Sequence, residues 1–284
     1  MRGGFGDSCN KISCGANPRT GKDFPLPSWW DLFRFGPGMR RLKTFQTQYQ
    51  TLEIWKSEQG VEFRVEGAIH ASFQRGRFLT GLAWDMIAAS ALLGGNQAPR
   101  SVLMLGLAGG TAFRTLRHLL PDCELTAIDI DAEIVELARG HMELDALGIE
   151  VVIGDAYPWL ARNRRRFDVV IDDIYLAGKT DVFRPRQWDD RLMDHLKRAV
   201  APGGVLAVNL VTGAGHRTMQ SLTRKVLREH FPELRSITSR DAMNEVLVAG
   251  GKVATARRLQ DHLGGFSDKR DRMFWNRLKV TKIR

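Results

Sequence analysis

The stretch from Ser101 to Asp131, SVLMLGLAGGTAFRTLRHLLPDCELTAIDID, constrains the fold more than any other part of the sequence. It predicts an apolar strand over 102–105, a glycine turn, a helix over 111–120, and a second apolar strand over 125–128. Continuous apolar runs are typical of parallel strands that are covered on both faces, and a strand, helix and strand of this length form a crossover unit. The chain is therefore expected to have an α/β fold.

The glycine turn and the acid that follows the second strand indicate a nucleoside site. Gly106, Gly109 and Gly110 allow the backbone to turn tightly and to approach a ligand at the N-terminus of a helix. Asp129, about 20 residues further on, can accept hydrogen bonds from two ribose hydroxyls. Ala108 stands where the dinucleotide fingerprint has its second glycine, so an adenosyl ligand without a pyrophosphate fits better. Without the acid, the glycine turn would be only a connection.

Composition limits the class of protein. The 284 residues are 43% hydrophobic, enough for one large domain or for one domain with a small satellite. No apolar run approaches the ~20 residues that span a bilayer, and the first residues lack the apolar core of a secretory signal. Cys9, Cys14 and Cys123 are an odd number without a C-x-x-C pair or a nearby histidine. A cytoplasmic protein without membrane segments, disulfides or a metal is the expectation.

The net charge of +10 suggests an acidic partner, because a positive field attracts nucleic acid and anionic substrates. The basic runs at 162–166 and 270–272 are short and carry no interleaved aromatics. A solvated basic surface explains them equally well, so no motif indicates a nucleic-acid partner.

The pattern divides the chain into three parts. Residues 1–43, rich in Gly, Pro and Arg, are predicted to be a flexible arm. Residues 44–93 are predicted to form a small β-hairpin domain with two or three antiparallel strands over 48–78, followed by a connecting helix over 79–93. Residues 94–284 are predicted to form a Rossmann-like nucleoside-binding catalytic domain.

Strands and helices alternate beyond the central stretch. Further strands are predicted at 150–153, 167–171, 205–210, 237–238 and 245–249, and helices at 132–144, 158–162, 188–201 and 216–230. This alternation is typical of a doubly wound sheet, which binds ligands at the carboxyl ends of its strands.

Four residues at predicted strand ends should converge on one crevice. Gly106, Asp129, Asp155 and Asp173 each follow a strand directly. Asp155 could accept a hydrogen bond from an adenine amine, with the backbone of Ala156 near the ring. Asp173 would lie deepest, beside the transferred group. A helix cap or a loop acid is the simpler interpretation of Asp173, but the shared placement favours a functional one.

The chain resembles the spermidine synthase (polyamine aminopropyltransferase) family. The resemblance covers roughly 48–249 and is carried by VLMLGLAGGTAFRTL, AIDID, GDAYPWL and FDVVIDD, and by the Tyr49-Gln50 and Glu66-Gly67-Ala68-Ile69 of the small β-domain. Class I methyltransferases that depend on S-adenosylmethionine (AdoMet) share the sheet but usually lack that domain. The fold implied is their Rossmann-like doubly wound sheet, preceded by a small antiparallel β-domain.

The resemblance also implies the chemistry, which is a step of polyamine biosynthesis. The co-substrate would be decarboxylated AdoMet or AdoMet, no metal would be needed, and the partner would be a small-molecule amine or another nucleophile. Asp173 would match the acid that takes a proton from the attacking amine. The residues that would hold the adenosyl nucleoside are Gln50, Gly106, Gly110, Asp129, Asp155 and Ala156.

The departures from the family concentrate on the acceptor side. Gly109 replaces the acid that binds the aminopropyl ammonium, His70 replaces a glutamine, and Leu176 replaces the second acid of the D-x-x-D loop. A polyamine needs carboxylates around it, and this site has lost several. His70, Trp84 and Tyr175 are predicted to form an acceptor pocket in their place.

Three hypotheses stay open from the sequence. The first is aminopropyl transfer to an amine, with Asp173 as general base. The second is an AdoMet-dependent methyltransferase on the same scaffold, because the loss of the acid at Gly109 removes a repulsion against the carboxylate of AdoMet. The third is a binding protein without catalysis, because the acceptor residues are eroded and the surface is basic. The acceptor and the oligomeric state are not fixed; the arm or the hairpin domain could serve a homodimer interface.

Overall fold

The structure is a computed structural model, and it describes residues 38–95, 97–178, 182–186 and 188–283. Most of the arm predicted over 1–43 lies outside these residues, as do Cys9 and Cys14. Cys123 is a buried free cysteine, and burial raises the pKa of its thiol to about 11.

A four-stranded antiparallel sheet occupies the position of the predicted hairpin domain. Its strands pair in chain order and are β1 (Arg40–Gln46), β2 (Thr51–Lys56), β3 (Gly60–Val65) and β4 (Ala68–Gln74). The sequence predicted two or three of them, and β1 begins inside the segment assigned to the arm. The side chains of β1 are exposed except for a half-buried Phe45, so this edge strand shows no apolar alternation and is held by its pairing with β2.

The central sheet has eight strands in the order β14-β12-β13-β11-β8-β5-β6-β7. These strands are β5 (Ser101–Leu105), β6 (Glu124–Asp129), β7 (Ile149–Ile153), β8 (Phe167–Asp172), β11 (Val200–Val211), β12 (Glu233–Thr238), β13 (Asn244–Gly250) and β14 (Lys279–Lys282). The five from β11 to β7 are parallel, whereas β13, β12 and β14 are antiparallel. A separate short pair joins β9 (Leu176–Ala177) to β10 (Val182–Phe183). The predicted α/β class is confirmed, and the strands predicted at 237–238 and 245–249 lie in the antiparallel pair of β12 and β13.

The α-helices are α1 (Ala83–Ser90), α2 (Thr111–Leu119), α3 (Ala132–Met142), α4 (Ala156–Arg162), α5 (Asp190–Ala199), α6 (Arg217–His230), α7 (Ala256–Gln260) and α8 (Lys269–Trp275). Single 3-10 turns lie at Ala91–Leu93, Leu144–Leu147, Ala214–His216 and Leu263–Gly265. The sequence patterns predicted neither α7 and α8 nor β14. No helix of the described residues is long and apolar enough to cross a membrane.

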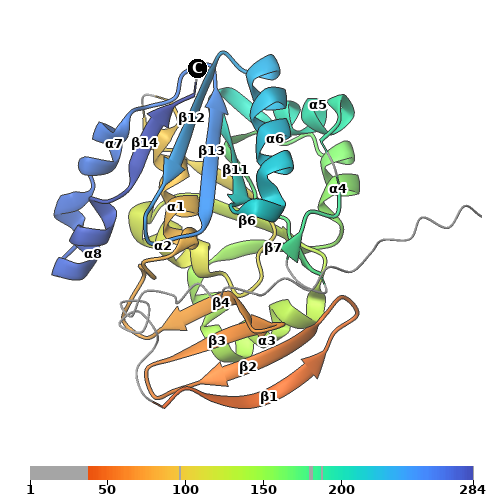
Figure 1. The fold of residues 1–284 in the computed structure, drawn as a ribbon, viewed down its shortest axis with the longest axis vertical. Helices are drawn as coiled ribbons and strands as arrows, with labels where there is room; N and C mark the ends of the chain where they lie inside the picture. The colour runs from red at the N-terminus through yellow and green to blue at the C-terminus, as the bar shows by residue number, and fades with distance from the viewer. Residues whose placement is uncertain (1–37, 96, 179–181, 187, 284) are drawn as a thin grey trace, which may run out of the picture. The chain divides into compact units, whose positions relative to one another are not determined.

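Buried side chains alternate along the parallel strands and divide the core into two layers. One layer contains Val102, Met104, Leu125, Ala127, Val169 and Ile171, and the other contains Leu103, Leu105, Ile128 and Val170. The first layer packs against α1, α2 and α3, and the second packs against α4, α5 and α6, which stand together along one side of the sheet in Figure 1. Each face is thus covered, as the continuous apolar runs require.

The small sheet shares the first of these layers. Its Leu52, Ile54 and Phe63 are fully buried in the same cluster as the residues of α1 to α3. Two polar links reinforce this packing. The Thr47 hydroxyl donates to Asp131 Oδ2 at 2.7 Å, and Thr111 Oγ1 accepts from Ser72 N at 2.8 Å and donates to Ser72 O at 3.0 Å.

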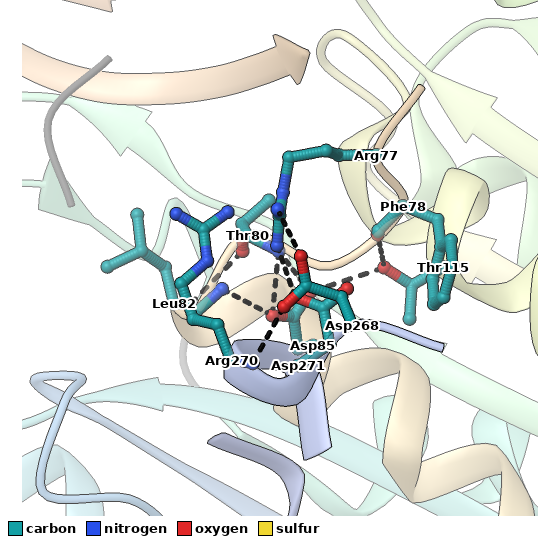
Figure 2. A network of polar contacts seen from close by, with 10 residues as sticks. Arg77, Phe78, Thr80, Leu82, Asp85, Thr115, Asp268, Arg270 and Asp271 are labelled. Carbon is teal, nitrogen blue, oxygen red and sulfur yellow. Dashed lines mark hydrogen bonds and ion pairs between the residues drawn. The ribbon is translucent and has the colours of Figure 1, made fainter. Parts of the chain in front are cut away.

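A buried carboxylate organises the connection between the two sheets (Figure 2). Asp85, in the first turn of α1, is fully buried and accepts hydrogen bonds from the backbone amides of Thr80 at 2.9 Å and Gly81 at 2.7 Å. The hydroxyl of Thr115 in α2 lies 3.2 Å from Asp85 Oδ1. The carboxylate thereby closes the turn that leads into α1.

The same region is tied to the C-terminal part of the chain. Arg77 forms an ion pair with Asp268 at 3.2 Å and another with Asp271 in α8, and the side chains meet in Figure 2. Phe274 and Trp275 of α8 are buried in the first core layer. Packing and ion pairing with residues far along the chain therefore hold this short helix.

Candidate functional site

The candidate site lies where the winding of the sheet reverses. The chain leaves β5 toward β6 on one side, and later returns to the other side of β5 as β8. Ligands bind at such switch points in doubly wound sheets. Asp173 N donates to Leu105 O at 2.9 Å, which places the end of β8 beside the glycine turn.

The glycine turn is shaped by its contact with that strand end. Gly106 has φ of +93°, and a Cβ atom at this position would lie 2.5 Å from the backbone oxygen of Asp173. Gly110 has φ of +74° and caps α2. A side chain at Gly106 would separate the two strand ends, so their close contact requires glycine there.

Gly109 packs closely against β4 and α3. A Cβ atom there would lie 2.5 Å from Ala71 Cβ in β4 and closer still to Met142 Sδ in α3. The family's acid at this position therefore has no room in this chain. The glycine that replaces the family's acid at position 109 is therefore the residue that this packing accommodates.

Asp129 holds the turn from inside the protein. Its Oδ2 accepts from the amides of Leu107 at 2.8 Å and Ala108 at 2.9 Å, and its Oδ1 accepts from Asp131 N at 2.9 Å. Burial raises the pKa of this carboxyl group. A carboxylate has about four acceptor sites, so these contacts leave capacity for one further hydrogen bond rather than the two predicted.

Gln50 offers a polar atom that nothing described in the structure satisfies. It lies in the turn between β1 and β2, where its backbone bonds to Thr47. Its side-chain Oε1 is buried, and no residue in the described part of the chain donates to it. Because buried polar atoms are normally paired, this amide oxygen fits a ligand that supplies a donor.

Asp155 and Ala156 follow β7. Asp155 Oδ1 accepts from Tyr157 N at 2.9 Å and caps α4, whereas the side chain as a whole is exposed and Ala156 is buried. Gly154 N donates to Asp129 O at 2.8 Å, which joins the ends of β6 and β7. The structure thus places both residues at the same edge as Gly106 and Asp129.

Asp173 is the acid at the centre of this edge. Asn209 Nδ2 in β11 donates to its Oδ1 at 2.8 Å. The residue keeps part of its surface accessible, yet the protein around its carboxyl group raises the pKa to about 7 through desolvation. A carboxyl group that titrates near neutrality and remains within reach of a ligand suits proton transfer.

The three predicted acceptor residues are not gathered by contacts of the described residues. The hydroxyl of Tyr175 donates to Asn209 O at 2.9 Å and accepts from Val211 N at 3.2 Å, so it is committed to β11. His70 lies in β4, where burial lowers its pKa, and Trp84 packs against the core at the start of α1. Among the hydrogen bonds and ring contacts of the described ranges, none joins His70 or Trp84 to Tyr175 or Asp173.

Sequence reasoning missed three residues around Asp173. Asn209 is a lone amide in the apolar run VLAVNL, and this polar residue in a buried strand was a usable signal. Asp172 and Arg184 form a buried ion pair at 2.6 Å next to Asp173. Nothing in the pattern around Arg184 signals it, because its partner lies twelve residues away in the sequence.

Together, the fold and the edge define a class: Rossmann-like α/β proteins of the doubly wound type, with an additional antiparallel sheet before the central sheet. Within this class the chain belongs to the spermine/spermidine synthase domain family, whose sequence profile matches residues 84–252, more than half of the chain. The resemblance seen in the sequence is thereby confirmed.

Individual relatives share shorter segments. A probable polyamine aminopropyl transferase of Bifidobacterium longum (strain NCC 2705) is 32% identical over 133 residues, which are 46% of this chain and 28% of that protein. An eEF1A lysine and N-terminal methyltransferase homolog of Drosophila melanogaster is 26% identical over 174 residues, 58% of this chain and 26% of that protein. The matched segments therefore span less than a third of each of these two relatives.

The fold is similar to that of a spermidine synthase whose crystal structure was solved in complex with the transition state analogue AdoDATO. The TM-score is 0.64 with 17% sequence identity, and the match covers 81% of this chain and 80% of that chain. The predicted fold class is confirmed by this likeness.

Proposed function

We propose that this protein is a spermidine synthase-like transferase that moves an aminopropyl group from decarboxylated AdoMet to an amine, with the cytoplasm as its expected compartment. Family membership and the aminopropyl transferase relative support this proposal. One observation carries it: Asp173, with a pKa of about 7, lies against the glycine turn at the switch point of the sheet.

The nucleoside would be held by the edge residues already described. The unpartnered Gln50 Oε1 and the remaining acceptor site of Asp129 fit the hydroxyl groups of a ribose. The residues assigned to nucleoside binding are Gln50, Gly106, Gly110, Asp129, Asp155 and Ala156. No group of three or more His, Cys, Asp or Glu side chains in the described ranges is arranged to hold a metal ion.

Asp173 would act on the amine. The sulfonium compound supplies an electrophilic carbon next to its sulfur; the amine nitrogen bonds to this carbon while the carbon–sulfur bond breaks and its electron pair stays on sulfur. Asn209 fixes Oδ1 of Asp173, and this carboxylate takes the proton that the nitrogen loses. Positioning of the amine would supply most of the rate.

Methyl transfer from AdoMet is the second candidate. It is favoured by Gly109, which has no room for an acid that would repel the carboxylate of AdoMet, and by the methyltransferase homolog of Drosophila melanogaster. In this reaction Asp173 would keep the same role, and the leaving group would retain its amino-acid part.

Calorimetric titration and a transfer assay test the proposal. We expect methylthioadenosine to bind, and decarboxylated AdoMet to support transfer to at least one amine of a panel. Clearly tighter binding of intact AdoMet, with transfer of its methyl group, would favour the second candidate. If neither compound binds, the assignment as a transferase is wrong.

A further inference from the structure

A buried arginine beside the proposed base has unused hydrogen-bond donors. The side chain of Arg184 is 1% exposed, and its Nη2 donates to Asp172 Oδ2 at 2.6 Å. Its Nε and Nη1 are buried, and neither has a hydrogen-bond partner among the residues that the structure describes. These two atoms carry three of the five N–H groups of the guanidinium. A buried cation is normally paired and fully hydrogen-bonded.

Two more buried polar groups surround the same guanidinium. The ring of Trp188 lies 5.1 Å from it, and the ring of Tyr175 lies 5.5 Å from it. Trp188 Nε1 and the hydroxyl of Tyr157 are also buried without a partner in the described ranges. Burial and the nearby charge of Asp172 raise the pKa of the Tyr157 hydroxyl. The ring contact of Trp188 with Arg184 and the effect of the Arg184 charge on Tyr157 place both residues in the surroundings of this guanidinium.

The chemistry of this group is that of a donor set. Guanidinium and indole N–H groups can only donate, and a phenol can donate. Their shared need is an acceptor, and a carboxylate offers about four acceptor sites with a negative charge. The ammonium groups of a polyamine are donors and would leave every one of these groups unsatisfied. Asp172 ends β8 and Asp173 follows it; desolvation raises the pKa of Asp173 and the charge of Arg184 opposes this rise, so the donors lie near the proposed base.

We propose that Arg184, Trp188 and Tyr157 bind a carboxylate of the ligand that occupies the site beside Asp173. This inference rests on the proposed function and specifies it: the ligand set includes a carboxylate, in contrast to a purely cationic acceptor. The carboxylate belongs either to the amine acceptor or to the methionine part of intact AdoMet. Both sources present the same group to the arginine, so binding experiments must separate them.

The acceptor is tested with three amines that share a four-carbon chain: γ-aminobutyrate, n-butylamine and putrescine. They end in a carboxylate, a methyl group and an ammonium group. We expect γ-aminobutyrate to bind at least tenfold more tightly than the other two in calorimetry, with and without methylthioadenosine. Tyr157→Phe and Trp188→Phe each remove one donor and keep an aromatic ring. Each variant should weaken the binding of γ-aminobutyrate about threefold to tenfold and leave the affinity for n-butylamine unchanged.

The nucleoside source is tested with S-adenosylhomocysteine, which carries the carboxylate, and methylthioadenosine, which lacks it. If the carboxylate is that of AdoMet, the same two variants weaken the binding of S-adenosylhomocysteine and leave the binding of methylthioadenosine unchanged. Arg184→Gln is combined with Asp172→Asn so that no unpaired charge stays buried. This double variant should abolish the preference for the carboxylate ligand, whether the wild type shows that preference for γ-aminobutyrate or for S-adenosylhomocysteine.

Arg186→Gln is the matched control. Its guanidinium lies 5.4 Å from the ring of Tyr157 but supplies none of the unpartnered buried donors, so it should leave the preference intact. If methylthioadenosine binds but neither carboxylate ligand is preferred or affected by the variants, the inference is wrong and the proposed function stands. If methylthioadenosine fails to bind, the proposed function fails, and the titrations without nucleoside still decide on the carboxylate site.

Discussion

Asp85 is a buried acid and Asp173 is a partly accessible one, and the two have different surroundings. Desolvation raises the pKa of each to about 7. Asp85 accepts from two backbone amides, with a threonine hydroxyl beside it, and every donor comes from the protein. Among the described residues, Asp173 accepts from Asn209 alone, and it lies next to buried donors that have no partner in the same ranges. A raised pKa therefore does not distinguish a structural acid from a functional one, whereas the use of its acceptor sites does.

The largest expected effect comes from Asp173→Asn. The amide cannot take a proton, so kcat/KM of the transfer reaction should fall by about 10²- to 10⁴-fold. The free energy of unfolding at neutral pH should not fall, because the shape is kept and a carboxyl group whose charged form is desolvated is replaced by a neutral amide. Steady-state kinetics and urea denaturation measure the two quantities. Full activity of this variant would end the assignment of a general base.

Asp85→Ala should show the opposite pattern. It leaves the amides of Thr80 and Gly81 without an acceptor in a buried turn, and the free energy of unfolding should fall by about 3 kcal/mol. In the fraction that stays folded, nucleoside affinity should match that of the wild type. A variant as stable as the wild type would show that Asp85 does not have the structural role assigned to it.

Gly109→Ala tests whether the glycine turn is closed on the side facing the small sheet. The added methyl group meets Ala71 and Met142, and overpacking should cost about 2 kcal/mol. Gly140→Ala is the control, because no atom lies within 4 Å of a Cβ at that helical position. There we expect no loss of stability, or a gain of up to about 1 kcal/mol. Equal effects of the two changes would contradict the close packing.

The effect of pH on the transfer rate is smaller than that of Asp173→Asn, and pH separates the two acids by readout. The transfer rate should fall about tenfold from about pH 8 to about pH 6, because Asp173 must be ionised to accept a proton. Both acids hold their protons more tightly in the folded chain than in the unfolded one. The free energy of unfolding should therefore fall as pH rises from about 4 to about 7. In Asp85→Ala the rate profile should persist, and the stability profile should lose the part due to Asp85 and keep the part due to Asp173; a rate independent of pH would contradict the proposed role of Asp173.

The elements around β5 could be predicted almost to the residue, because apolar runs, a glycine turn and regular spacing all agree there. β1 could not, since its side chains are mostly exposed and its pairing partner β2 decides its conformation. The same holds for α8, which is held by Phe274, Trp275 and ion pairs with Arg77. Local sequence patterns do not indicate which distant residues pack against a segment.

The candidate site divides in the same way. Gly106, Asp129 and Asp173 could be placed at one edge because each follows a strand. Two other features depend on side-chain packing across the fold. Asp129 uses most of its acceptor sites on the glycine turn, and Arg184 forms an ion pair with Asp172. The pocket predicted from His70, Trp84 and Tyr175 stays a prediction, because no hydrogen bond or ring contact in the described ranges joins His70 or Trp84 to Tyr175.

The links from Thr47 to Asp131 and from Ser72 to Thr111 have a consequence for how the protein can be shortened. Asp131 caps α3 and Thr111 opens α2, so the small sheet braces the first turns of both helices that flank the glycine loop. A fragment without residues 38–78 would also expose the apolar surface that Leu52, Ile54 and Phe63 now cover. The two sheets should therefore unfold in a single calorimetric transition. A fragment that keeps only the central sheet and its helices should be less stable and should bind the ligand less tightly.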